Sequence, residues 1–168
     1  MKGRLVTNTG PLIALTSLNR LDILLSLFTS VHVPQAVHDE MVQGGGAQTG
    51  LEAYRQADWI IVAPAVPVDP LLSTILDQEE AAVIALARSL GADMVLIDER
   101  KARKIARNIY RLPVMGSARV LVEAKRHGLL DNVAAALRAM RDQGYWIHEA
   151  IVHYALREAG ETNELSAQ

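Results

Sequence analysis

The stretch that most constrains the fold is a short apolar run, residues 94–97 (Met-Val-Leu-Ile), which ends on the adjacent carboxylates of Asp98 and Glu99. Strands buried on both faces of a parallel sheet are apolar throughout, whereas a strand with one face in water alternates apolar and polar residues. The run follows an alanine-rich segment, residues 78–90, whose composition favours a helix. A helix that leads into such a strand predicts an α/β protein with a mainly parallel sheet.

The rest of the chain repeats this alternation, so we predict a three-layer sandwich with helices on both faces of a mainly parallel central sheet. The expected strands are residues 4–7, 31–33, 59–62, 94–97 and 113–115. The expected helices are residues 12–27, 35–41, 51–57, 78–90, 99–110, 118–127 (capped by Ser117), 132–143 and 147–159. A glycine-rich loop is expected at residues 43–46. The proline-rich segment 63–70 is too short to separate domains, so we expect one domain over residues 1–161 and a polar C-terminal tail over residues 162–168.

Composition narrows the classes of function. The 168 residues include no cysteine, which excludes disulfides, thiolate metal sites and cysteine nucleophiles and fits a cytoplasmic protein. No apolar run is long enough to cross a bilayer, so we expect no membrane association. The formal net charge of -2 means that nucleic-acid binding would depend on a local basic surface. Neither a glycine loop for nucleotides nor a GxSxG nucleophile elbow occurs, which disfavours nucleotide-cofactor and serine-hydrolase chemistry.

Oxygen-bearing side chains follow several of the expected strands or begin the helices that come after them. Because parallel strands end at one rim of a sheet, such side chains can meet there although they are far apart in sequence. Carboxylate and amide oxygens suit Mg²⁺ or Mn²⁺ better than zinc. Clustered carboxylates also repel each other unless a cation lies between them. The candidate metal ligands are Asn8, Glu40, Glu80 and Asp98.

Each of these side chains also has a simpler explanation. Glu80 lies three residues after an aspartate that could cap its helix, which is the spacing of a capping box, and Glu40 could be a solvated surface acid. Asp98 could be a plain N-cap, and Asn8 could cap the first helix. Glu99 fits a first-turn acid favoured by the helix dipole better than a ligand. These alternatives stay open at the level of sequence.

A basic stripe begins next to Asp98. Its cations recur at the spacing of a single helical face, and they are Arg100, Arg103, Lys104, Arg107 and Arg111. A stripe of this kind can follow a phosphate backbone, which would make binding strongly dependent on salt. It is equally typical of an ordinary solvated helix face.

Taken in order, the motifs of this chain resemble those of PIN domains, in particular a prokaryotic PIN-like subfamily. The resemblance covers roughly residues 4–160. It rests on residues 8–13 (Asn-Thr-Gly-Pro-Leu-Ile), on Val33-Pro34 leading to Val37 and Glu40, on residues 79–87, on residues 96–103 (Leu-Ile-Asp-Glu-Arg-Lys-Ala-Arg), on residues 126–129 and on Gly144-Tyr145.

This resemblance implies a Mg²⁺- or Mn²⁺-dependent ribonuclease fold, often the toxin half of a toxin–antitoxin pair with a small antitoxin protein as partner. PIN-like domains also commonly form homodimers. By the resemblance, the four family acids fall on Asn8, Glu40, Glu80 and Asp98, with Glu99 as an accessory catalytic residue. Most nuclease members have Asp where this chain has Asn8. An amide oxygen can ligate a metal but brings no charge, so a lower metal affinity is implied.

The leading hypothesis is an endoribonuclease that hydrolyses RNA phosphodiesters with metal-activated water. In this hypothesis Glu40, Glu80 and Asp98 bind one or two divalent ions. Asn8 ligates or orients water, and the cations from Arg100 to Arg107 hold the RNA. The alternative is a PIN-like module with weak or no catalytic activity that binds RNA or protein, which Asn8 favours. A small-molecule hydrolase on the same frame lacks a nucleophile signature.

Overall fold

A computed structural model of the chain describes residues 1–44 and 48–162. Within these residues five strands form one sheet in the order β3-β2-β1-β4-β5, and every neighbouring pair is parallel. The strands are β1 (Arg4–Thr7), β2 (Ser30–Pro34), β3 (Ile60–Ala63), β4 (Met94–Leu96) and β5 (Val114–Met115). The predicted α/β class with a mainly parallel sheet is confirmed, and each strand overlaps its expected segment.

The centre of the sheet is formed by β1, which pairs with β2 on one side and β4 on the other. The side chains of Leu5 and Val6 in β1 and of Val95 and Leu96 in β4 are fully buried. These strands therefore have the continuous apolar character that burial on both faces requires. The register sets Thr7, the last residue of β1, opposite Leu96, the last residue of β4.

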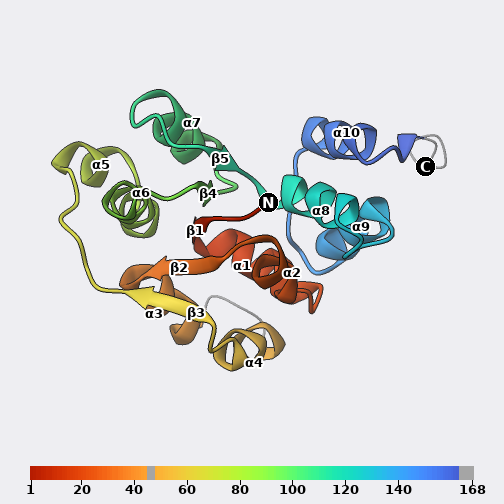
Figure 1. Cartoon of the computed structure of the whole chain (residues 1–168), viewed down its shortest axis with the longest axis horizontal. Helices are drawn as coiled ribbons and strands as arrows, with labels where there is room; N and C mark the ends of the chain where they lie inside the picture. Colours follow the sequence, from red (N-terminus) through yellow and green to blue (C-terminus); the bar gives the residue numbers. More distant parts are fainter. Residues whose placement is uncertain (45–47, 163–168) are drawn as a thin grey trace.

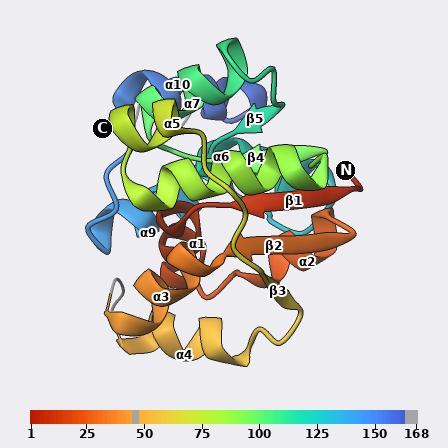
Figure 2. The ribbon, with the colours of Figure 1, turned by 90° about the vertical axis from the view of Figure 1, so that its left-hand side faces the viewer.

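Helices cover both faces of the sheet. Figure 1 shows the sheet between α6 on one side and α1, α2 and α8 on the other, and Figure 2 looks onto the α6 side. The two last helices, α9 and α10, pack against α8 on the outside of the second layer. The helices are α1 (Thr9–Ser17), α2 (Asp22–Leu27), α3 (Gln35–Gln43), α4 (Gln48–Gln56), α5 (Pro70–Ile75), α6 (Gln78–Leu90), α7 (Arg100–Asn108), α8 (Ser117–Arg126), α9 (Val133–Asp142) and α10 (Glu149–Glu158).

The helix expected over residues 12–27 is divided into α1 and α2. The first ends at Ser17, and the chain turns at Asn19, which adopts the left-handed conformation with φ 53°. Asparagine enters this region at a lower cost than most residues, because its short polar side chain can bond locally. The apolar spacing is continuous across the break, so periodicity alone did not reveal it.

The proline-rich segment expected to be a connector, residues 63–70, ends at the first residue of a helix that was not expected, α5. Asp69 caps this helix by accepting the N–H of Leu71 (2.9 Å), and Pro70 occupies its first turn. Proline suits the first helical turn because its missing N–H would have no partner there. The Asp-Pro pair is therefore a helix start in this chain.

The C-terminal helices are tied together by Glu161, whose side chain is buried. Its carboxylate accepts the N–H groups of Val133 (2.8 Å) and Ala134 (2.7 Å) at the start of α9 and pairs with Lys125 of α8 (2.6 Å). Burial alone would raise the pKa of Glu161, but the hydrogen bonds and the lysine outweigh burial and lower it. This contact holds the end of the domain against α8 and α9.

Two predictions fall on segments that the structure does not describe. Residues 45 and 46 of the expected glycine-rich loop and residues 163–168 of the expected polar tail lie outside the described residues. In the described part of the chain, no helix combines the length and the apolar composition that crossing a bilayer requires.

Candidate functional site

The candidate site lies where the strand order reverses, between β1 and β4. In an open parallel sheet, this reversal leaves a crevice beyond the carboxyl ends of the two strands. Asn8 follows β1 directly, and Asp98 comes shortly after β4. The backbone N–H of Asn8 donates to the carbonyl oxygen of Leu96 (3.0 Å), which holds the two strand ends side by side. The structure thus brings together two of the predicted site residues.

The side chain of Asn8 has an unusual environment. The residue occupies the N-cap position of α1, but its side chain caps no backbone N–H group. Its Oδ1 atom is buried and, among the described residues, is the one buried side-chain oxygen or nitrogen without a hydrogen-bond partner. A buried acceptor left unpaired costs about 1–3 kcal/mol. The helix-cap explanation therefore does not account for Asn8, whose buried oxygen has no partner among the described residues.

Asp98 is held by three hydrogen bonds. Its Oδ1 accepts the backbone N–H of Ser117 (2.7 Å), and its Oδ2 accepts the hydroxyl groups of both Ser117 and Tyr145. The N-cap of α7 is instead Glu99, whose Oε2 accepts the N–H of Ala102 (2.7 Å). Asp98 is therefore not the N-cap of α7, and it binds the N–H of Ser117, the first residue of α8, instead. The exposed Glu99, expected as a first-turn acid, is the N-cap of α7.

Glu80 lies in the first turn of α6 and is buried, with 6% of its surface exposed. Asp77 caps this helix by accepting the N–H of Glu80 (2.8 Å), so the expected N-cap is present. Within the described residues the Glu80 carboxylate itself accepts no hydrogen bond. Burial, followed by repulsion from Asp77 and Glu99, raises the pKa of Glu80 to about 7. A buried carboxyl beside other acids is the environment that a cation would relieve.

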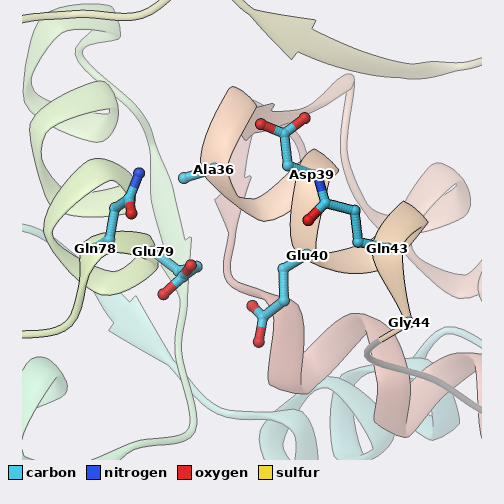
Figure 3. A pocket seen from close by; sticks show the side chains of 7 residues that line it. All are labelled: Ala36, Asp39, Glu40, Gln43, Gly44, Gln78 and Glu79. Atoms are coloured by element: carbon cyan, nitrogen blue, oxygen red, sulfur yellow. The ribbon is translucent and has the colours of Figure 1, made fainter.

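Glu40 lies on α3 and lines a cavity of about 420 Å³ between α3 and the start of α6. One of its carboxylate oxygens accepts the hydroxyl of Thr9, the residue that follows Asn8. Figure 3 shows Glu40 from α3 and Glu79 from α6 facing the same gap. Glu40 is thus exposed but anchored to the start of α1, rather than being an unattached surface acid. The residues that line the cavity are Ala36, Asp39, Glu40, Gln43, Gly44, Gln78 and Glu79.

The basic stripe on α7 divides into a half-buried and an exposed part. Arg103 is half-buried near Asp98, and burial, then Arg107, lowers the pKa of its guanidinium against the opposing effect of Asp98. A Cβ atom on Gly116 would lie 2.9 Å from Asp98 Oδ1 and 3.3 Å from Arg103 Nη1, so only glycine leaves room for both side chains. The exposed cations of the stripe are Arg100, Lys104 and Arg107.

Arg111, expected to extend the stripe, does not lie on the helix. Helix α7 ends at Asn108, and Arg111 adopts the left-handed conformation with φ 56°. The predicted helix over residues 99–110 is therefore shorter at both ends, and the basic face of α7 extends from Arg100 to Arg107.

The four candidate ligands do not form a closed metal cage. Within residues 1–44 and 48–162, no group of three or more Asp, Glu or His side chains is arranged to hold a metal ion. The residues nevertheless fit a divalent ion in their chemistry, because they offer only oxygen donors. The buried oxygen of Asn8 has no partner among the described residues, and burial, followed by repulsion from Asp77 and Glu99, raises the pKa of Glu80.

Sequence reasoning missed four side chains that shape this site: Thr9, Glu79, Ser117 and Tyr145. Thr9 and Glu79 each adjoin a residue that was selected, so proximity in sequence was a usable signal. Ser117 was expected to cap a helix, but Gly116 occupies the N-cap of α8, and Ser117 binds Asp98. Tyr145 has no local signal that connects it to the site.

Residues 4–161 match a family model described as a PIN domain. A search of curated proteins finds no match.

Proposed function

Because the chain belongs to the PIN domain family, whose fold is of the nuclease type, we propose that it is a divalent-metal-dependent endoribonuclease. The observation that supports this most directly is the buried, unpartnered Oδ1 of Asn8 beside the strand end that leads to Asp98. An orphaned acceptor at the switch point of a parallel sheet is a natural position for a ligand.

The residues that would hold the ion are Asn8, Glu40, Glu80 and Asp98. Bound Mg²⁺ or Mn²⁺ supplies an acidified water and positive charge for phosphodiester hydrolysis. Three of the four side chains bring negative charge, and Asn8 brings a neutral oxygen. Burial and then repulsion from Asp77 and Glu99 raise the pKa of Glu80, and a bound ion would offset both effects.

The chain's own cations would position the RNA. Arg103 lies beside Asp98 and can bind a phosphate at the reacting centre, where its planar guanidinium matches phosphate geometry. Arg100, Lys104 and Arg107 are exposed along the same helix and would bind neighbouring phosphates. Glu99 stabilises this helix by capping it, which keeps the basic face next to the carboxylates.

The test is RNA cleavage with Mn²⁺ by wild type, Asp98→Asn and the control Asp58→Asn. Asp58 is exposed, in the turn between α4 and β3, so its substitution leaves the crevice untouched. We expect wild type and Asp58→Asn to cut RNA and Asp98→Asn to lose cleavage. Equal cleavage by all three proteins would reject the mechanism.

A second candidate is a PIN-like module that binds RNA or protein and cuts weakly or not at all. It is favoured by the neutral amide at Asn8 and by the lack of a closed group of acids among the described residues. Calorimetric titration with Mn²⁺ separates the two candidates. The nuclease should take up the ion and bind it far more weakly in Asp98→Asn, whereas the binding module needs no uptake.

For the biological setting, we propose that residues 1–161 form a single cytoplasmic PIN-like domain followed by a short tail, and that it is the toxin of a toxin–antitoxin pair. The proposal includes a small antitoxin protein and a homodimer. Exposed apolar side chains such as Ile61, Ile109 and Trp146 could serve such contacts. A short open reading frame beside the gene and a dimer mass by light scattering are the expected results.

A further inference from the structure

Tyr145 connects the C-terminal helices to the candidate site. It lies between α9 and α10, yet its hydroxyl donates to Oδ2 of Asp98, 47 residues earlier in the chain. Desolvation by burial, followed by the charge of Asp98 and the hydrogen bond to it, raises the pKa of Tyr145. The phenol is thus a hydrogen-bond donor to the carboxylate throughout the physiological pH range.

The hydroxyl of Tyr145 lies close to the first turn of α1. A Cβ atom placed on Gly10, in the first turn of α1, would lie 3.2 Å from the Tyr145 hydroxyl oxygen. That separation is tighter than most contacts of a real Cβ atom, so a larger residue at this position would press on the phenol. Gly10 follows Asn8 and Thr9, and the first turn of α1 therefore forms one wall of the position that the hydroxyl occupies.

The hydrogen bonds to Asp98 determine what its carboxylate can offer. A carboxylate has about four lone-pair positions for hydrogen bonds or metal ions. The hydroxyl groups of Ser117 and Tyr145 occupy both positions on Oδ2, and the N–H of Ser117 occupies one on Oδ1. One position remains, on Oδ1, so Asp98 can ligate an ion through that single oxygen.

We propose that Tyr145 is a positioning residue that fixes the Asp98 carboxylate so that only Oδ1 faces the divalent ion. The proposal rests on the proposed function, because it assigns a role toward an ion that Asp98 would bind. In other proteins, removing a side chain that orients a ligating residue lowers metal affinity by roughly 10- to 100-fold. A tyrosine that only fastened the C-terminal helices would affect stability instead.

The experiment measures Mn²⁺ affinity, by calorimetry and by the electron paramagnetic resonance signal of free Mn²⁺, for wild type and Tyr145→Phe. Tyr154→Phe is the matched control, since Tyr154 is half-exposed on α10. We expect Tyr145→Phe to bind Mn²⁺ about ten-fold more weakly. Tyr154→Phe should bind Mn²⁺ like wild type.

A double-mutant cycle tests whether Tyr145 acts through Asp98. In the Asp98→Asn background, adding Tyr145→Phe should leave the residual Mn²⁺ affinity unchanged. Ser117→Ala, which removes the other hydroxyl on Oδ2, should weaken binding in the same direction as Tyr145→Phe.

The outcomes separate the two proposals. Wild type that binds no Mn²⁺ would overturn the proposed function and the role of Tyr145 with it. If wild type and Tyr145→Phe bind Mn²⁺ with the same affinity, the positioning role alone is overturned. This holds even if Tyr145→Phe lowers the melting temperature, because a loss of stability without a loss of affinity indicates a structural role. A further loss of affinity in the Asp98→Asn background would show that Tyr145 does not act through Asp98.

Discussion

In the metal-free protein, the charged form of the buried Glu80 should lower the free energy of unfolding as the pH rises. The pKa of Glu80 is raised from 4.5 to about 7, first by burial and then by Asp77 and Glu99. Between these two values the folded protein keeps a proton that the unfolded chain releases. The stability that the neutral carboxyl contributes is therefore lost as the pH rises through the folded pKa. Glu80→Gln keeps the shape of the side chain and removes the charge.

The size of the effect follows from the shift. The rise from 4.5 to about 7 corresponds to about 3 kcal/mol at roughly 1.4 kcal/mol per pKa unit. About 2.5 kcal/mol of this falls between pH 5 and pH 8 by linkage. Screening by nearby water and salt reduces the repulsion, so we expect Glu80→Gln to gain about 1 to 2.5 kcal/mol on wild type over this interval.

The assay is urea unfolding in the presence of EDTA, near pH 5 and near pH 8, with tryptophan fluorescence as the signal. A matched change at the exposed Glu52 of α4, Glu52→Gln, reports the effect of losing a surface carboxylate. Saturating Mn²⁺ near pH 8 should reverse the order, because an ion that binds the ionised carboxylate stabilises the wild type. A stability difference between wild type and Glu80→Gln that is equal at both pH values would refute the reasoning.

Three further changes test other parts of the structure. Asn8→Asp adds charge at the buried oxygen and should raise Mn²⁺ affinity about ten-fold, together with RNA cleavage; unchanged affinity in calorimetry would argue against a ligand role. Glu161→Gln should lower the free energy of unfolding by about 1–3 kcal/mol near pH 7, and urea titrations should show the difference shrinking below pH 4.5, as the lowered pKa of Glu161 requires. Lys104→Ala should weaken RNA binding and reduce its salt dependence by about one counterion, whereas Arg55→Ala on α4 should do neither; filter binding that is equally affected by both would exclude a specific role for α7.

The parallel sheet could be predicted because burial on both faces leaves a local pattern in the sequence. Residues 94–97 are apolar without interruption, and the strand they contain lies inside the sheet, with Val95 and Leu96 fully buried. The place of Asn8 and Asp98 at one rim follows from the same pattern, since neighbouring parallel strands end at the same edge. The sheet, and the edge at which Asn8 and Asp98 lie, could thus be predicted from patterns within short segments of the sequence.

The partners of these side chains could not be predicted in this way. Tyr145 reaches Asp98 only because the segment between α9 and α10 returns to the start of α1, and no spacing rule encodes that path. Serine is a residue type that often caps helices, but the N–H and hydroxyl groups of Ser117 both donate to Asp98. Whether an oxygen such as Oδ1 of Asn8 finds a partner is likewise decided by packing between distant segments.

The central position of β1 affects how the protein is synthesised. Residues 4–7 leave the ribosome before the other strands of the sheet, and β2 can pair with them early, but the strand on the other side begins only at Met94. During that interval the nascent chain carries an apolar strand with one edge open, which is the kind of surface that promotes association between growing chains. Translation from the end of β2 to the end of β4 is therefore the period in which a chaperone would protect this protein most.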